Sequence, residues 1–335
     1  WEYVSVELAT GNAKFGIQNT DGSRSIRTIF EPMRKMGATA RAILVSAAAK
    51  KWQILESECS AENHYVINSK NNDKLFYGDL VEEAMAIEVP KEVPLKNKKD
   101  FKYIGKKLKS IDINDFTHGT AIYGIDARLP NMKFATIARC PSTFGSVKSF
   151  DKTNALKISG VVDVVELERV KRPFGMMGGV AVVATNTWAA IQGRNKLSID
   201  WNKGSNGNYE SKNYLKKITS RVHNKGKSVG TKGNVNKAFS KAANIVEATY
   251  QMPHLAHAPM ETPNALAWFH DGKCEVWAPV QSPQSAREEV ANYLGIEKDN
   301  VTIHVTWEVD LEENQNQILS LKPLRYQNKL KHLFK

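Results

Sequence analysis

The strongest constraint on the fold comes from the middle of the chain, where strand-like segments surround one helix-like segment. GVVDVVEL (160–167) and GVAVVAT (179–185) have the length and β-branched content of buried strands. NTWAAIQGRNKL (186–197) follows at once and predicts a helix, because its first residue, Asn186, is a preferred N-cap. LSIDW (197–201) then predicts a returning strand. This order of elements is typical of an α/β unit.

Two segments before this unit alternate between apolar and polar residues. TAIYGIDARL (120–129) and KFATIARC (133–140) show the period-two pattern of half-buried strands. Because they are close in sequence, we expect these two segments to pair with each other.

The N-terminal quarter predicts a long helix and a hairpin. TIFE has the capping-box pattern, with Thr28 as N-cap and Glu31 reaching back, so the helix is predicted over 28–52. HYVINSKNNDKLFYG (64–78) predicts two strands joined by a polar turn, and a short helix is expected from Asp79.

A third block is strongly marked by turn residues. ALAWFHDGKCEVWAP (265–279) predicts a hairpin with an Asp-Gly turn. SPQSAREEVANYLG (282–295) predicts a helix that Ser282 caps and a final glycine ends. NVTIHVT (300–306) predicts one more strand. We therefore expect an α+β protein.

A length of 335 residues predicts two or three domains. Between the patterned blocks lie a Lys- and Pro-rich segment, interpreted as a linker, and a Gly-, Asn- and Lys-rich segment, expected to be a loosely ordered excursion. The expected division is 1–90, linker 91–117, 118–202, excursion 203–240, 241–306 and a tail at 307–335.

The formal net charge is +12, and eight lysines lie within residues 91–110. One interpretation is a surface that binds nucleic acid or another acidic partner. The other, which we favour, is a solvated linker, because most basic residues here are lysines and Arg is the better bidentate phosphate ligand. No apolar run is long enough to span a bilayer.

The spacing of the cysteines and the absence of several sequence motifs argue against several kinds of functional site. Cys59, Cys140 and Cys274 are widely separated, so the sequence predicts neither a zinc site nor an iron–sulfur cluster within the chain. The chain has no P-loop, GxGxxG or GxSxG motif. No protein-ligated metal site is expected.

Three segments hold candidate binding residues. QNTDGSRSIR (18–27) could cradle a phosphate through backbone N–H groups, hydroxyls and guanidinium groups, or could be an ordinary turn before a helix. Gln281 follows a strand and precedes a helix N-terminus, a position that suits contact with a ligand. His254, His257 and Glu261 make a metal site conceivable, but a structured loop with a bonded histidine is the favoured interpretation.

The patterned segments, taken in this order, resemble the large molybdopterin-binding subunit of the xanthine dehydrogenase family. The segments that carry the resemblance are TDGSRSIRTIFEPMRKMGATARAILVSAAAKKW, GTAIYGIDARLPNMKFATIARCP, VAVVATNTWAAIQGRNKLSIDW and LAHAPMETPNALAW with CEVWAPVQSPQSAREEVANYLG. The branch it resembles is the isoquinoline 1-oxidoreductase β-subunit type, whose members are often called aldehyde dehydrogenases. The resemblance covers nearly all of residues 1–306.

The resemblance implies a molybdenum hydroxylase that adds a water-derived oxygen to an N-heterocycle or an aldehyde. It implies a molybdopterin cytosine dinucleotide cofactor and a separate small subunit with [2Fe–2S] clusters that carries the electrons away. Gly22, Ser23, Arg24 and Ser25 would hold the phosphate end of the cofactor, and Gln281 would lie near it. Residues 118–202 would form an α/β hammerhead domain, flanked by portions of the cofactor-binding domains at 1–90 and 241–306.

The resemblance ends after Thr306, where the family continues with a GGGFGR turn and this chain reads WEVDLEENQNQ. Trp307 is encoded by TGG, and the next four residues can be encoded by GAG, GTG, GAT and TTG. Read one base earlier, after ACA for Thr306 and with the GA that begins the Glu312 codon, these bases spell Met-Gly-Gly-Gly-Phe-Gly. We therefore hypothesise that residues 307–335 are translated in a shifted frame; a genuine divergent tail is the alternative, and either would be poorly packed.

On this hypothesis the chain is a fragment that lacks the Gly-rich turn and the catalytic glutamate, a general base that the family keeps further along. The chain as given is then expected neither to retain the cofactor nor to turn over. Its first residue, Trp1, also indicates a fragment or a processed product. The compartment stays open between bacterial periplasm and cytoplasm, with the periplasm slightly favoured because related chains often carry export leaders. A Lys-rich binding protein without catalysis is the alternative function.

Overall fold

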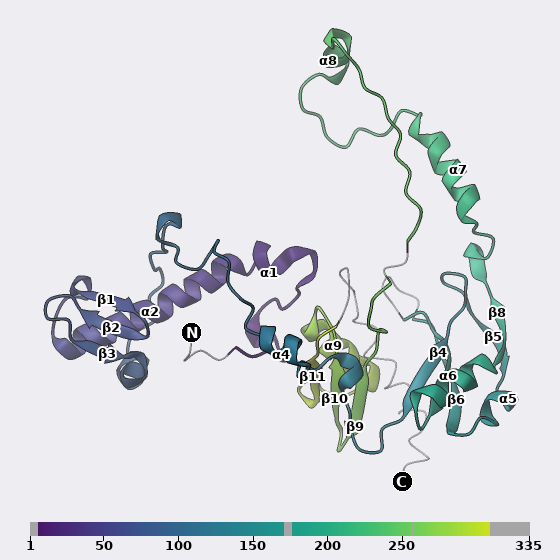
Figure 1. The fold of residues 1–335 in the computed structure, drawn as a ribbon, viewed down its shortest axis with the longest axis horizontal. Helices are drawn as coiled ribbons and strands as arrows, with labels where there is room; N and C mark the ends of the chain where they lie inside the picture. Colours follow the sequence, from purple (N-terminus) through teal and green to yellow (C-terminus); the bar gives the residue numbers. More distant parts are fainter. Residues whose placement is uncertain (1–5, 171–175, 256–257, 309–335) are drawn as a thin grey trace. The chain divides into compact units, whose positions relative to one another are not determined.

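The computed structural model describes residues 6–170, 176–255 and 258–308 (Figure 1). The chain divides into two compact units, which are described separately. The smaller unit spans residues 15–121, and the larger unit contains residues 6–14 and the described residues from 122 onward. Helices and mostly antiparallel sheets make up both units, which confirms the α+β class.

In the smaller unit, one long helix packs on a three-stranded antiparallel sheet (Figure 1). The helix α2 (Phe30–Trp52) presents Ala47 and Ala48, both fully buried, to Val66 of the sheet and to Leu80. Small side chains at these positions allow the close approach that the alanine-rich sequence predicts. The remaining elements are β1 (Cys59–Glu62), β2 (Tyr65–Asn68), β3 (Lys74–Phe76) and α3 (Val81–Met85).

The predicted capping box at Thr28 is wrong. A short helix, α1 (Arg24–Arg27), precedes α2, and Thr28 follows it as the C-cap. The Thr28 backbone N–H and hydroxyl both donate to the Arg24 carbonyl oxygen, each at 2.9 Å. Glu31 instead pairs with Lys35 (3.0 Å) on the surface of α2. Because α1 already uses the donors of Thr28, α2 begins two residues later than predicted and ends at Trp52 as predicted.

The Lys- and Pro-rich segment is attached to α2 through one arginine. Arg34 donates from Nη2 to the Lys96 carbonyl oxygen (2.7 Å), and its guanidinium lies 5.4 Å from the Phe30 ring and 5.1 Å from the Phe101 ring. Lys102 forms an ion pair with Glu62. Within the expected linker, a helix not foreseen from the sequence, α4 (Ile113–His118), also forms.

The larger unit contains a three-stranded sheet in the order β4-β7-β6. Every residue of β7 (Gly179–Ala184) is buried between β4 (Phe134–Ala138) and β6 (Val161–Leu167). Helix α6 (Thr187–Asn195) contacts β4 and β7, and the Asn186 side chain accepts from the Ala189 N–H at 2.8 Å, as predicted for its cap. The further elements here are β5 (Ser146–Asp151), α5 (Thr153–Leu156) and β8 (Ser198–Asn202), with β5 antiparallel to β8.

The predicted strand at 120–129 is wrong. A turn of 3-10 helix, η6 (Gly124–Asp126), occupies this segment, and the partner of β4 is β7. The Tyr123 N–H donates to Asp126 Oδ2 (3.1 Å), which closes the turn locally. The Ile125 N–H donates to Glu261 Oε1 (2.8 Å), a carboxylate 136 residues away that the local pattern does not reveal.

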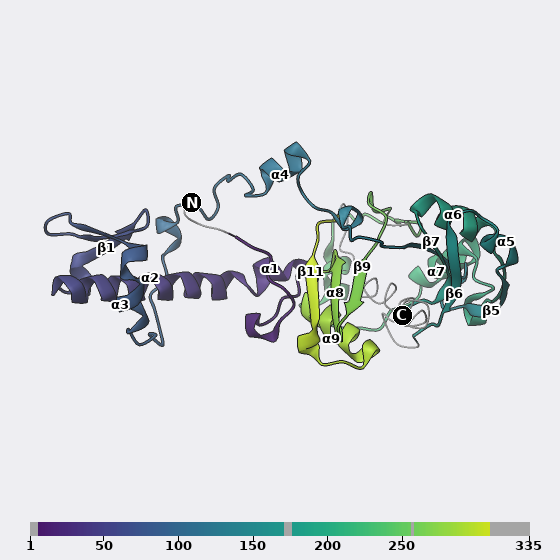
Figure 2. The same cartoon turned by 90° about the horizontal axis from the view of Figure 1, so that it is seen from below.

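The third sheet, β11-β10-β9, confirms the predicted hairpin and helix (Figure 2). Asp271 (φ 46°) and Gly272 (φ 73°) form the turn, and both have the left-handed conformation that a type I′ turn needs. Helix α9 packs its apolar face on the sheet, with fully buried Val276, Val290 and Ile303 in the core. The elements are β9 (Leu266–His270), β10 (Lys273–Ala278), α9 (Pro283–Leu294) and β11 (Val301–Val305), with β11 parallel to β10.

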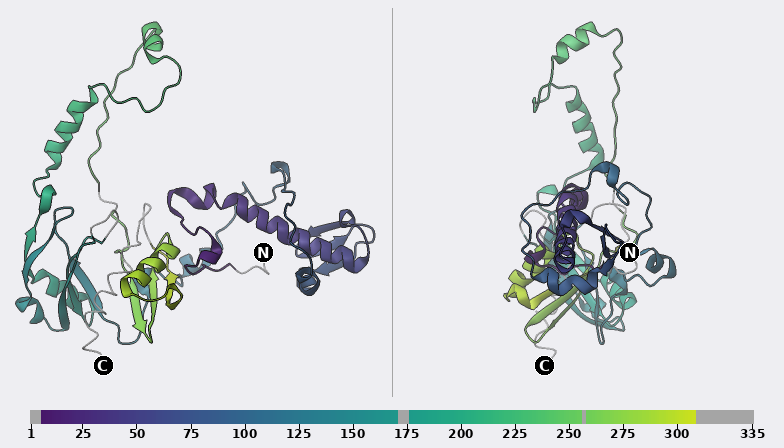
Figure 3. Two further views of the ribbon diagram at one scale, coloured as in Figure 1. Left: turned by 180° about the vertical axis from the view of Figure 1, so that it is seen from behind. Right: turned by 90° about the vertical axis from the view of Figure 1, so that its left-hand side faces the viewer.

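The expected loose excursion contains two capped helices, α7 (Ser211–Val222) and α8 (Val235–Lys241) (Figure 3). Glu210 accepts from the N–H groups of Lys212 and Asn213 at the start of α7, and Asn234 accepts from the Lys237 N–H at the start of α8. The segment is therefore partly helical, because side-chain caps satisfy the N–H groups that neither helix can bond internally.

Short 3-10 turns complete the described elements: η1 (Ala13–Phe15), η2 (Asp21–Ser23), η3 (Glu56–Glu58), η4 (Tyr77–Leu80), η5 (Lys98–Asp100), η7 (Gly204–Asn206) and η8 (Lys298–Asn300). Over the described ranges, no helix has both the length and the hydropathy needed to cross a bilayer. The frame-shift hypothesis and the predicted poor packing concern residues 307–335, of which 309–335 lie outside the described residues. Trp307 is described, and its backbone is hydrogen-bonded to Ile122 and Gly124.

Candidate cofactor-binding site

The carboxyl ends of β10 and β11 meet at one edge of their sheet, because the two strands are parallel. The segment 279–282 leaves β10 there and leads directly into α9, whose first residue is Pro283. Gln281 lies in this connection and is half-buried. Its amide can donate and accept hydrogen bonds beside the positive end of the α9 dipole, an environment that suits a polar or anionic ligand group.

The caps of α9 agree with the sequence in position but not fully in chemistry. Ser282 occupies the N-cap position, but its hydroxyl bonds Ser285 Oγ (2.9 Å) rather than a backbone N–H of the first turn. Gly295 ends the helix in the left-handed conformation, as predicted. The first-turn N–H groups therefore receive no bond from the Ser282 side chain.

A segment from before β4 extends this edge of the sheet. The Trp307 N–H donates to the Ile122 carbonyl oxygen (3.2 Å), and the Gly124 N–H donates to the Trp307 carbonyl oxygen (3.1 Å). A side chain at residue 124 would displace its neighbours, since a Cβ there would lie 2.7 Å from Asn264 Oδ1 and 3.2 Å from Thr306 Oγ1. Glycine at 124 thus lets three segments converge beside the candidate site.

Glu261 holds two of these segments together. It is buried, and its Oε1 accepts from the Ile125 N–H and from Asn264 Nδ2, both at 2.8 Å. His254 lies elsewhere, 5.8 Å from the Tyr214 ring, and His257 lies outside the described residues. In the part of the chain that the structure describes, no group of three or more His, Cys, Asp or Glu side chains could hold a metal ion.

Gly11 is part of this neighbourhood although sequence reasoning missed it. It is buried against the first turn of α9, and a Cβ at this position would lie 2.4 Å from the Pro283 carbonyl oxygen and 2.9 Å from the Gln284 nitrogen. The only signal in the sequence is the glycine itself, which does not reveal so distant a contact.

The phosphate-loop candidates belong to the smaller unit, whereas Gln281 belongs to the larger one. Gly22 (φ 54°) and Ser23 (φ 58°) are both left-handed and turn the chain into α1. Arg24 forms an ion pair from Nε to Asp21 Oδ1 (3.1 Å), so part of its charge is already compensated. Ser25 is exposed in the first turn of α1.

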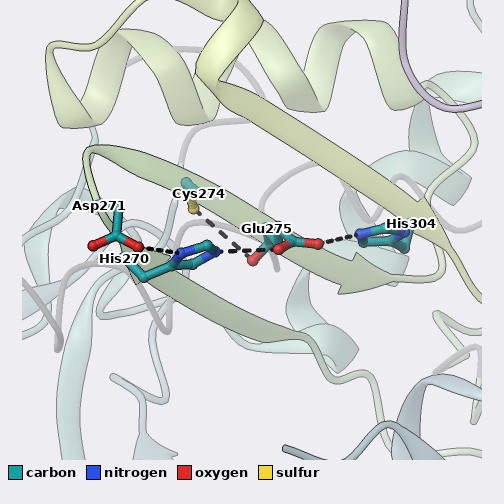
Figure 4. A network of polar contacts seen from close by, with 5 residues as sticks. All are labelled: His270, Asp271, Cys274, Glu275 and His304. Carbon is teal, nitrogen blue, oxygen red and sulfur yellow. Dashed lines mark hydrogen bonds and ion pairs between the residues drawn. The ribbon is translucent and has the colours of Figure 1, made fainter.

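A second polar cluster, not foreseen from the sequence, lies on the sheet face opposite α9 (Figure 4). Glu275 Oε1 lies 3.2 Å from His270 Nε2, and Glu275 Oε2 lies 2.8 Å from His304 Nε2. The His304 hydrogen bond is the main cause that lowers the pKa of Glu275; the His270 bond also lowers it, and burial opposes both. Each imidazole stacks on an indole, His270 on Trp268 (centroids 3.7 Å apart) and His304 on Trp277 (4.6 Å).

The three cysteines are free and do not form a cluster. Cys274 is buried beneath the same sheet, and burial raises the pKa of its thiol to about 12. Such a thiol is not a metal ligand or a nucleophile near neutral pH.

Comparison with known proteins identifies the region around Gln281. A family model described as the molybdopterin cofactor-binding domain matches residues 219–307. The chain is 28% identical over 312 residues to a membrane-bound aldehyde dehydrogenase [pyrroloquinoline-quinone] of Gluconacetobacter polyoxogenes, with 90% of this chain and 40% of that protein covered. It is 24% identical to the β-subunit of isoquinoline 1-oxidoreductase of Brevundimonas diminuta, with 91% of this chain and 44% of that protein covered.

One further relative by sequence and one solved structure are also similar to this chain. A nicotinate dehydrogenase subunit of Pseudomonas putida is 27% identical, with 85% of this chain and 24% of that protein covered. The solved structure of quinoline 2-oxidoreductase from Pseudomonas putida 86 aligns with a TM-score of 0.48 at 15% identity, over 67% of this chain and 33% of that one. The chain spans 24–44% of the length of the three relatives compared by sequence.

The matched residues include β9, β10, α9 and β11, so they contain both Gln281 and the edge of the sheet beside it. The family suggested by the long ordered segments of the sequence is confirmed. Residues 219–307 match a molybdopterin cofactor-binding domain, and most of the chain is similar to subunits of the xanthine dehydrogenase family.

Proposed function

We propose that this chain carries part of the cofactor-binding machinery of a molybdenum hydroxylase that oxidises an N-heterocycle or an aldehyde. The observation that carries this proposal is the match of residues 219–307 to a molybdopterin cofactor-binding domain, a stretch that includes the sheet edge bearing Gln281. The names of the relatives support the substrate classes, since they include an isoquinoline oxidoreductase, a nicotinate dehydrogenase and an aldehyde dehydrogenase.

The residues present fit a polar, anionic cofactor. Gln281 is half-buried beside the N-terminus of α9, where an amide and helix N–H groups without a side-chain cap favour hydrogen bonds to such a group. No protein metal site is needed, because molybdenum in this family is held by the pterin dithiolene. When bound, the cofactor supplies the two-electron redox chemistry that places a water-derived oxygen on the substrate carbon.

We assign the phosphate end of the cofactor to Gly22, Ser23, Arg24 and Ser25. Gly22 and Ser23 turn the chain into α1 with left-handed conformations, and the exposed Ser25 presents its hydroxyl group in the first turn of that helix. The Arg24–Asp21 ion pair reduces the net positive charge of this loop, so hydrogen bonding is its larger contribution. The nucleotide that best fits the family branch is cytosine dinucleotide.

The wider assembly follows from the same proposal. Residues 118–202 form the α/β hammerhead domain, and the cofactor-binding portions are 1–90 and 241–306. A small [2Fe–2S] subunit accepts the electrons. The periplasm of a bacterium is the favoured compartment. The alternative of a nucleic-acid or acidic-surface binding protein receives no support from the proteins that this chain resembles.

Cofactor content tests the proposal. The natural protein, purified with its partner subunits from cells grown on molybdate, should contain stoichiometric molybdenum and release CMP on acid hydrolysis. Growth on tungstate should abolish oxidation of the N-heterocycle or aldehyde. Gln281→Ala should lower the molybdenum content, and Gln192→Ala, a change to a glutamine of α6 outside the matched residues, should not.

The same experiment separates the proposal from its rivals. A molybdenum-free protein whose activity pyrroloquinoline quinone restores would refute the cofactor assignment. Release of a nucleotide other than CMP would contradict only the cytosine form. Equal molybdenum content in the Gln281→Ala and Gln192→Ala proteins would show that Gln281 does not help hold the cofactor.

A further inference from the structure

A pocket of about 430 Å³ lies in the larger unit, outside the residues that match the cofactor-binding domain. Its walls come from three elements: β4 with the residue after it, the last turn of α6 with the residues after it, and β8. This volume is within the range of small-molecule sites in proteins. The molybdenum chemistry proposed above makes no use of the pocket.

Two arginines line the pocket. Arg139 follows β4, and its Nη1 donates to the Gly178 carbonyl oxygen (2.7 Å), which fixes the guanidinium in position. Arg194 enters from the last turn of α6. Throughout the described ranges neither arginine has a carboxylate within ion-pair distance, so two arginines line one pocket without a protein counter-ion. Burial lowers the pKa of Arg139, the direction expected when a charge lacks compensation.

The rest of the wall is mainly apolar. Ile199 and Trp201 lie on the same face of β8, and Ile137 of β4 lies two residues before Arg139. Trp201 offers a flat aromatic surface. None of the lining residues carries a hydroxyl group. The two guanidinium groups suit an anion, and the apolar wall around them favours one attached to a flat apolar body, such as an aromatic carboxylate, over a fully hydrated anion such as inorganic phosphate.

We propose that this pocket binds a small aromatic carboxylate, whose carboxylate group is held by Arg139 and Arg194 and whose ring lies against Trp201. A guanidinium group presents paired N–H donors that match the two oxygens of a carboxylate, and the apolar side chains of the wall can contact the ring. The proposal stands on the pocket alone and is independent of the bound cofactor.

Benzoate is the probe, titrated into the full 335-residue chain by calorimetry and by tryptophan fluorescence. Benzoate is expected to bind saturably at millimolar concentration, whereas benzamide, which has the ring but no charge, and inorganic phosphate bind much more weakly. The fluorescence change should disappear in Trp201→Phe while calorimetric binding persists. Failure of saturable benzoate binding, or equal binding of benzamide or phosphate, refutes the proposal.

Two variants and a matched control test whether Arg139 and Arg194 bind the carboxylate group of benzoate. Arg194→Gln should weaken benzoate binding about tenfold, the effect of losing a charge-assisted hydrogen bond. Arg221→Gln, which removes the same charge from the exposed helix α7, should leave binding unchanged. Arg139→Lys keeps a cation near Gly178 but removes the paired N–H donors of the guanidinium group, so it should also weaken benzoate binding. Equal affinities of the Arg194→Gln and Arg221→Gln proteins, with both melting as the parent does, would overturn the assignment.

Discussion

Gly11→Ala should loosen the first turn of α9, where the candidate site begins. The added Cβ would lie 2.4 Å from the Pro283 carbonyl oxygen and 2.6 Å from its carbonyl carbon. Side-chain carbons do not come nearer than 3.0 Å to such atoms, so the two backbone segments must separate. Both contacted atoms belong to the backbone of Pro283 and not to a flexible side chain, and overpacking of this kind costs about 1–3 kcal/mol. For a unit of this size, each kcal/mol lowers the melting temperature by about 2–4 °C.

The matched control is Gly37→Ala. Gly37 lies inside α2, and apart from its chain neighbours and the backbone of its own helix no atom lies within 4 Å of an added Cβ, so alanine there should raise stability by about 0.5–1 kcal/mol. Thermal unfolding gives the global effect, and amide hydrogen exchange of residues 284–294 gives the local one. Exchange in α9 should accelerate only in the Gly11→Ala protein. Unchanged melting and unchanged exchange in that protein would refute the packing of residue 11 on α9.

Further predictions concern the same unit and the chain that follows it. The pKa of Glu275 is lowered, so the bonds of its carboxylate stabilise the folded protein fully at a pH above 4.5, the ordinary pKa of a glutamate, and this stabilisation is lost as the pH falls through the lowered pKa. Glu275→Gln should flatten this dependence of the melting temperature on acid pH. Because burial raises the pKa of Cys274 to about 12, iodoacetamide should modify Cys140 well before it at neutral pH, as peptide mass spectrometry would show; equal rates would contradict its burial. Asn186→Ala should cost about 1 kcal/mol in urea unfolding through loss of the α6 cap, and no change would dismiss the cap. The gene should read ACA for Thr306 and encode GGGFG one base earlier; other codons there would dismiss the shifted frame.

Elements set by local chemistry were predicted correctly from the sequence. The Asp271-Gly272 turn forms because both residues tolerate the left-handed conformation, and α9 stops at Gly295 for the same reason. Asn186 caps α6 with its own side chain. Each of these features depends on residues within three or four positions, where one sequence contains all the interacting groups.

Errors occurred where a distant or competing bond decided the conformation. The segment at 120–129 alternates like a strand, but Glu261 takes the Ile125 N–H, and Asp126 takes the Tyr123 N–H to close a turn. Thr28 has a capping residue's side chain, but α1 uses it at its own C-terminus. An alternating pattern or a capping residue indicates which hydrogen bonds a residue can make. It does not indicate which partner the folded chain brings to that residue.

Some residues of the candidate site can be predicted from the sequence, and others cannot. Gln281 could be placed from sequence because a strand end before a helix start is a local pattern. Gly11 and Gly124 could not, because each contributes the absence of a side chain, and their contacts run to residues far away in the sequence. Trp307 contributes its backbone N–H and carbonyl, bonds that any residue other than proline could make. The edge of the sheet beside Gln281 is therefore built largely by backbone, which leaves no trace in the pattern of apolar residues.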